Sequence, residues 1–132
     1  MKPKIYFGHP VNFYNTPIEA DLIKRINHVF PEYELENPNN KTHQAAYKDF
    51  KEKTGNGMNY FYQVVLPKME LGVFLPFADG LFGAGVFNEA EFLSQNGKRI
   101  YEIDLEGTIR RLLINIKRKL SVEETRVRVY GK

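Results

Sequence analysis

A carboxylate follows a glycine-rich loop in the segment GAGVFNEAEFLSQNGKRIYEI, residues 83–103. Gly83 and Gly85 lead into a predicted helix that carries Glu89 in its first turn. The free N–H groups and the dipole of a helix N-terminus stabilise an ionised carboxylate, and such a carboxylate can attack an electrophilic carbon. Glycine lets a ligand approach the backbone closely. The pattern therefore indicates either a nucleophile at the mouth of a pocket or a Glu that only favours its own helix start.

The elements that must position Glu89 alternate between strands and helices. Short apolar runs predict strands at 4–8, within EYELENP, at 71–77 and at 98–104. Thr16, Pro17 and Glu19 form a capping signal that begins a helix ending near residue 30. Further helices are predicted over 41–54, from Met58 to a disturbance near Pro67, and over 86–96.

The C-terminal segment is ambiguous, because GTIRRLLI fits a strand or a helix and SVEETRVRVY combines a capping box with strand-like alternation. The rest of the chain predicts one domain, residues 1–132, with an α/β fold: a small doubly wound parallel sheet with helices on both faces. Ligands bind such sheets at the carboxyl ends of the strands. The loops GHPVNFYN and ADGLFGAG follow the first and third predicted strands and should be neighbours there.

Composition excludes several kinds of site. The chain has no Cys, which rules out disulfides and Cys-based metal sites, and its three His have no metal-ligand spacing, so no metal is expected. The N-terminus does not resemble a signal peptide and no apolar run could span a membrane, so a cytoplasmic protein is expected. The net charge is +3, with many basic residues in the C-terminal third. That segment is either a solvated face or a contact for nucleic acid.

The order of these features resembles the nucleoside 2-deoxyribosyltransferase family. Asp79, Gly85, Glu89 and the pair Gly97-Lys98 follow one another as they do in that family. IYFGHP resembles its opening strand, and LGVFLPF resembles the strand before its Asp/Gly loop. The similarity covers residues 4–10 and 70–104.

The resemblance implies a flavodoxin-like fold in a homo-oligomer whose active sites a neighbouring subunit completes. It implies cleavage of the N-glycosidic bond of a nucleoside or nucleotide, with no cofactor. Glu89 would be the nucleophile at the anomeric carbon, following the logic of retaining glycosidases, and Asp79 would be a catalytic base or a sugar contact. The substrate-binding residues would be Tyr6, Gly8, His9, Gly83, Gly85 and Asn88.

Departures from the family pattern leave other functions open. The family has an Asp in the helix before the third strand that helps to protonate the leaving base, whereas MNYFYQVVLP contains none. Asn59 is present, but Tyr60 or Val65 stands where the Asp is expected, and Glu91 replaces a frequent Gly. A general acid contributes about 10²–10⁴ in rate. His9 could supply it; otherwise the chain is a slower enzyme or a non-catalytic nucleotide-binding module.

Overall fold

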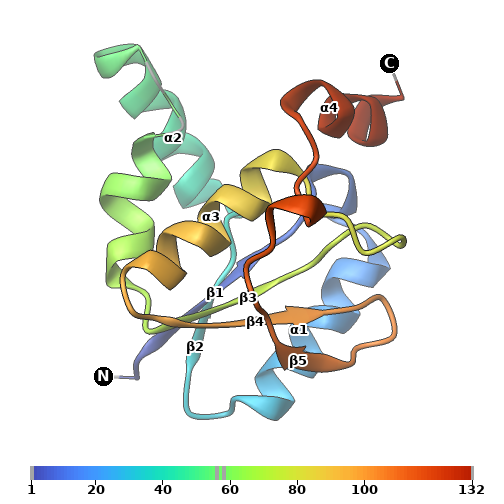
Figure 1. Ribbon diagram of the computed structural model, residues 1–132. Coiled ribbons are helices and arrows are strands. Elements are labelled where there is room, and N and C mark those ends of the chain that lie inside the picture. The colour runs from blue at the N-terminus through green and yellow to red at the C-terminus, as the bar shows by residue number, and fades with distance from the viewer. Residues whose placement is uncertain (1, 56, 58, 132) are drawn as a thin grey trace.

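One sheet organises the computed structural model, which describes residues 2–55, 57 and 59–131. Within these residues the sheet has five strands in the order β2-β1-β3-β4-β5 (Figure 1). The first four strands run parallel and β5 runs antiparallel to β4. The strands are β1 (Lys4–Gly8), β2 (Glu34–Glu36), β3 (Leu71–Phe74), β4 (Arg99–Ile103) and β5 (Ile109–Arg111).

Helices cover both faces of this sheet. α1 (Pro17–Val29) lies on one face, and α3 (Ala84–Gln95) lies on the other with α2 (Lys41–Thr54) beside it (Figure 1). α4 (Val122–Tyr130) follows at the C-terminus. The α/β fold with helices on both faces is therefore confirmed, and the strand order is the 2-1-3-4-5 order of flavodoxin-like doubly wound proteins.

The segment GTIRRLLI, which the sequence leaves open between strand and helix, forms the strand β5, and β5 is antiparallel to its neighbour. Parallel neighbours need a crossover of about a dozen residues or more, but β4 and β5 are joined by a short turn. The Asp104 carboxylate accepts hydrogen bonds from the N–H groups of Glu106 and Thr108 in this turn. Gly107 has a φ of 89°, which glycine adopts readily. The turn reverses the chain, so β5 pairs as a hairpin.

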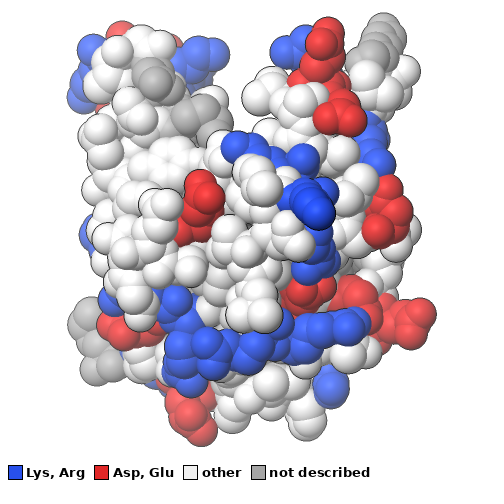
Figure 2. Space-filling view, in the orientation of Figure 1, with Lys and Arg blue, Asp and Glu red and all other residues white. Residues whose placement is uncertain are grey.

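The edge strand β5 carries exposed charge. Arg110 and Arg111 on β5 and Arg99 on β4 are exposed, and Figure 2 shows a band of Lys and Arg side chains across this part of the face. Charged side chains discourage a second chain from pairing with an open sheet edge. The exposed charges of Arg110 and Arg111 therefore disfavour the pairing of another strand with β5.

Helices form where they are predicted, but one of them differs in its type of helix. Thr16 caps α1 by accepting a hydrogen bond from the Glu19 N–H, as its spacing predicts. The predicted helix from Met58, a residue outside the described part, continues as a π-helix (Phe61–Val65) and a 3₁₀ turn (Leu66–Lys68) around Pro67. At the C-terminus the capping box of Ser121 and Glu124 is formed. Because the capping box supplies partners for N–H groups at the helix start, the segment forms the helix α4 and not the strand that its alternating residues would also allow.

Alternating side chains divide the core between the two faces. Ile5 and Phe7 of β1 pack with Leu22 and Ile26 of α1, while Tyr6 between them packs on the α3 side. This is the period of two that a strand imposes. The side chain of Tyr6, which ends in a hydroxyl, therefore points toward α3.

Glycines let α3 approach the sheet closely. In the register of β1 and β3, Tyr6 lies beside Gly72 and Gly8 lies beside Phe74. A Cβ at Gly8 would lie 2.6 Å from Phe74 Cδ1, and one at Gly72 would lie 2.6 Å from Phe74 Cε2. The Phe74 ring thus occupies the space of both missing side chains.

We expect Gly72→Ala to lower the free energy of unfolding by about 1–3 kcal/mol through overpacking, because the added Cβ would also lie 2.8 Å from Leu93 Cδ1. Gly85→Ala is the matched control, since its added Cβ would meet no atom within 4 Å apart from the neighbouring backbone of its own helix. It should leave stability unchanged or raise it by up to about 1 kcal/mol. Urea unfolding followed by circular dichroism measures both, and equal effects would contradict this packing.

Candidate functional site

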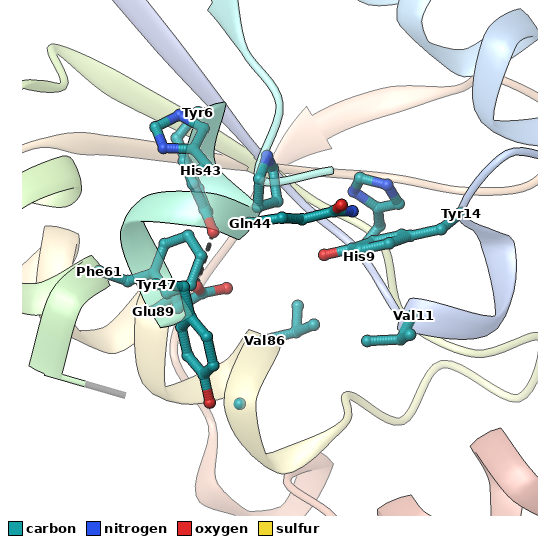
Figure 3. Close-up of a pocket in the computed structure, with 12 residues that line it drawn as sticks. Tyr6, His9, Val11, Tyr14, His43, Gln44, Tyr47, Phe61, Val86 and Glu89 are labelled. Atoms are coloured by element: carbon teal, nitrogen blue, oxygen red, sulfur yellow. Dashed lines mark hydrogen bonds between the residues drawn. The ribbon is translucent and has the colours of Figure 1, made fainter. Parts of the chain in front are cut away.

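A cavity of about 360 Å³ lies beyond the carboxyl end of β1, between the loop that follows it, α2 and α3. Its volume is within the usual range of about 300–1,000 Å³ for ligand pockets. It is lined by Tyr6 of β1, by His9 just beyond it, and by Glu89 of α3 (Figure 3). The chain leaves β1 and β3 toward opposite faces, so this is the switch point at which doubly wound sheets bind ligands. The loops after the first and third strands are therefore neighbours, as predicted.

Glu89 is buried in the wall of this cavity, with 8% of its surface exposed. The Tyr6 hydroxyl donates a hydrogen bond of 2.6 Å to Glu89 Oε2. Among the described residues none forms a hydrogen bond with Oε1. One carboxylate oxygen is thus held by the sheet while the other is available to a ligand.

The expectation that Glu89 lies in the first turn of its helix is wrong. The helix begins at Ala84 rather than at residue 86, so Glu89 is in the second turn and the first turn contains no acidic residue. Burial raises the pKa of Glu89 to about 7, and the hydrogen bond from Tyr6 opposes this shift only in part. Desolvation therefore outweighs any stabilisation by the helix N-terminus.

Gly8 provides the space that the carboxylate occupies. A Cβ at Gly8 would lie 3.2 Å from Glu89 Oε1 as well as against the Phe74 ring. Any side chain here would crowd the carboxylate oxygen that carries no hydrogen bond. Gly8 is therefore part of the site through its lack of a side chain.

His9 forms one wall of the cavity and has both ring nitrogens occupied. Nδ1 lies 3.0 Å from the carbonyl oxygen of Phe7, and Nε2 lies 2.7 Å from Glu19 Oε2. Burial lowers the pKa of the imidazole, while the hydrogen bond to Glu19 acts in the opposite direction. No ring nitrogen is left to approach a ligand, so His9 is not in a position to supply the missing acid.

His43, near the start of a polar helix, is expected from the sequence to be structural or exposed, and sequence reasoning missed that it lines the cavity. It is 8% exposed and lines the cavity. Nδ1 lies 2.7 Å from the Tyr60 hydroxyl, and Nε2 bonds the Glu36 carboxylate. These contacts join α2 to β2 and to the segment before β3. No spacing in the sequence pairs residues that are so far apart.

Aromatic side chains make up much of the remaining lining. Tyr14 comes from the loop after β1, Tyr47 from α2 and Phe61 from the π-helix (Figure 3). Ring faces of this kind accept stacked planar ligands. The composition of the chain indicated spare aromatic residues, but only the fold shows which of them meet.

Asp79 lies outside the cavity. Its carboxylate accepts hydrogen bonds of 2.9 Å and 2.7 Å from Arg128 of α4, and it faces a separate, charged depression with Glu102 and Arg118. The structure therefore does not bring Asp79 to Glu89. Its pairing with Arg128 holds the pKa of Asp79 below its usual range.

The other predicted binding residues divide between the cavity and its neighbour. Gly85 lines the Glu89 cavity and also an adjoining apolar depression, where Asn88 lies. Gly83 precedes α3 and lines neither. A Cβ there would lie 3.1 Å from Thr125 Cγ2, and the Thr125 hydroxyl accepts a 2.9 Å hydrogen bond from the Ala84 N–H. Gly83 therefore makes room for a cap supplied by α4.

The described residues contain no group of three or more His, Cys, Asp or Glu that could hold a metal ion. The cavity lining likewise includes no Lys or Arg among the residues placed in the structure. Its titratable groups are the carboxyl of Glu89, two imidazoles and three phenols. In the part of the chain described, no helix is both long enough and apolar enough to cross a bilayer.

Comparisons with protein-family models, with curated proteins and with solved structures found no match to this chain. The chemistry of the cavity is therefore the main guide to function. Its distinguishing group is a buried carboxyl with one oxygen held and one available.

The raised pKa of Glu89 predicts a pH-dependent stability. The folded chain keeps this proton between about pH 4.5 and pH 7, whereas the unfolded chain releases it, so stability falls as pH rises through this window. Relative to Glu89→Gln, the free energy of unfolding of the wild type should fall by about 3 kcal/mol across it. Denaturant titrations at several pH values measure this difference, and parallel curves for the two proteins would contradict the shift.

Proposed function

We propose that this chain breaks the N-glycosidic bond of a nucleoside or nucleotide, as a transferase or a hydrolase, with Glu89 as the nucleophile. The observation that carries the proposal is the state of the Glu89 carboxyl in the cavity. Tyr6 holds Oε2 at 2.6 Å, and Oε1 has no partner among the described residues. A carboxylate oriented in this way meets the first requirement of nucleophilic catalysis, which is a fixed direction of attack.

The chemistry would proceed by double displacement. Oε1 of ionised Glu89 attacks C1′ of the sugar, the C1′–N bond breaks, and the bond's electron pair leaves with the base. A second base or water then releases the sugar from the glycosyl ester. The ionised form of Glu89 gains population as pH rises through about 7. Tyr6 favours that form, because its hydroxyl donates to the charged carboxylate.

Two further observations support this function. The aromatic side chains of Tyr14, Tyr47 and Phe61 line the same cavity as Glu89 and offer faces for a planar base. The order of Tyr6, Gly8, Gly85 and Glu89 in the sequence also resembles the nucleoside 2-deoxyribosyltransferase family. Three of these residues line the cavity, and Gly8 lies against the Glu89 carboxylate.

The second candidate is a non-catalytic module that binds a nucleotide-like ligand in the same cavity. It is favoured by the lining itself, since Glu89 is the only carboxyl among the described residues around the cavity. Among these described residues there is therefore no second carboxylic acid to protonate the leaving base. A deoxynucleoside that raises the melting temperature without being consumed would support this candidate over the enzyme.

Incubation with deoxynucleosides and their 5′-monophosphates, followed by chromatography of free base, tests the enzyme. Glu89→Gln preserves the shape of the side chain and an acceptor for Tyr6, yet it should reduce base release by at least about 10³-fold. Asp79→Asn is the matched control. It should stay within about threefold of the wild type, because Asp79 pairs with Arg128 outside the cavity. No release by the wild type, or equal release by Glu89→Gln, would refute the proposal.

A further inference from the structure

The departing base is the part of the proposed reaction for which the cavity lacks an obvious partner. As the C1′–N bond breaks, negative charge collects on the base, and a donor aimed at that charge would lower the barrier. Glu89 is occupied as the nucleophile. Both ring nitrogens of His9 and of His43 already have partners. The inference that follows rests on the proposed function.

Tyr14 supplies a phenol hydroxyl to the cavity. Its side chain reaches from the loop after β1 into the cavity, with the hydroxyl directed toward the side where Tyr6 and Glu89 lie (Figure 3). Among the residues that the structure places, none forms a hydrogen bond with this hydroxyl. A half-buried phenol without a partner, facing a free carboxylate oxygen across a cavity, is suited to bind a polar ligand atom.

The loop holds Tyr14 in place without using its hydroxyl. The Tyr14 N–H donates to the Val11 carbonyl at 3.0 Å, and the Thr16 hydroxyl donates to the Phe13 carbonyl at 2.6 Å. The Tyr14 ring packs against the His9 ring with centroids 5.0 Å apart. His9 is in turn fixed by Glu19. The direction of the phenol is therefore set before any ligand enters.

We propose that Tyr14 is a catalytic residue whose hydroxyl donates a hydrogen bond to the departing nucleobase. In this step the bond from Glu89 Oε1 to C1′ forms and the C1′–N bond breaks. The electron pair of the broken bond stays on the base, and the Tyr14 O–H stabilises the resulting anion. The base then takes its proton from water, and Tyr14 remains protonated throughout.

The electrostatics of the cavity agree with a donor that keeps its proton. Burial, and after it the nearby Glu89 carboxylate, raise the pKa of Tyr14 well above its ordinary value. When Glu89 becomes a neutral ester, that carboxylate charge disappears. The hydroxyl is then a stronger hydrogen-bond donor at the moment when the base becomes anionic.

Two other side-chain donors among the described residues of the lining are placed less well. Gln44 is exposed, and its amide donates to Asn39 at 3.2 Å. The Tyr47 hydroxyl is directed away from Tyr14 and from the Tyr6–Glu89 pair (Figure 3). Tyr14 therefore remains the donor that faces the carboxylate.

The test compares Tyr14→Phe with the wild type on two substrates that differ in leaving group: thymidine and 5-nitro-2′-deoxyuridine, whose base is the more stable anion. On thymidine, kcat/KM should fall by about 10²-fold, as when one donor to a developing anion is removed. On the nitro substrate the loss should shrink to less than about tenfold. The ratio of the two rates on one preparation cancels any difference in the amount of folded protein.

The outcomes separate this inference from the proposed function. An equal loss on both substrates, or no loss on either, would overturn the role of Tyr14 and leave Glu89 chemistry standing. Wild-type protein that releases neither base would remove both. Tyr130→Phe deletes a hydroxyl from an exposed residue at the end of α4 and should change neither rate.

Discussion

The hydrogen bond between Tyr6 and Glu89 is the contact on which the rest of the site depends. It joins residues 83 positions apart in the chain, one in the central sheet and one in the helix above it. It requires that β1 and β3 be neighbours, and that α3 lie close enough to the sheet for the two side chains to meet. The missing side chains of Gly8 and Gly72 permit that approach, with the Phe74 ring filling the remaining space. The residues that pack α3 against the sheet are therefore also the residues that place the Glu89 carboxyl.

Much of the fold could be predicted from short stretches of sequence, because the residues that determine a helix start or a buried strand lie within a few positions of one another. Thr16 begins α1 by accepting a hydrogen bond from the Glu19 N–H, and Pro17 at the first helical position has no N–H that needs a partner. The buried run at Leu71–Phe74 is the central strand that its continuous apolar character indicates. β5 could not be assigned in the same way. Its direction depends on the hydrogen bonds of the Asp104 turn, which the apolar pattern of GTIRRLLI does not encode.

The site could be predicted only as far as the rule that doubly wound sheets bind ligands at the carboxyl ends of their strands. The carboxyl ends of adjacent strands meet, so Tyr6, His9 and Glu89 could be expected together, and they do line one cavity. The charge state of Glu89 could not be expected, because it depends on burial by distant residues. His43 and Tyr47 come from α2, whose polar sequence gives no sign that it borders a cavity. Asp79 has the spacing of a site residue, but Arg128 on α4 holds it elsewhere.

A threonine of α4 caps the start of α3. Gly83 has no side chain that could do so, and Thr125, 41 positions beyond Ala84, accepts the hydrogen bond of the Ala84 N–H instead. The helix that carries Glu89 is thus seated partly by the final residues described. Removing α4 would therefore leave the Ala84 N–H without this partner, at the start of the helix that carries Glu89, although α4 does not line the cavity.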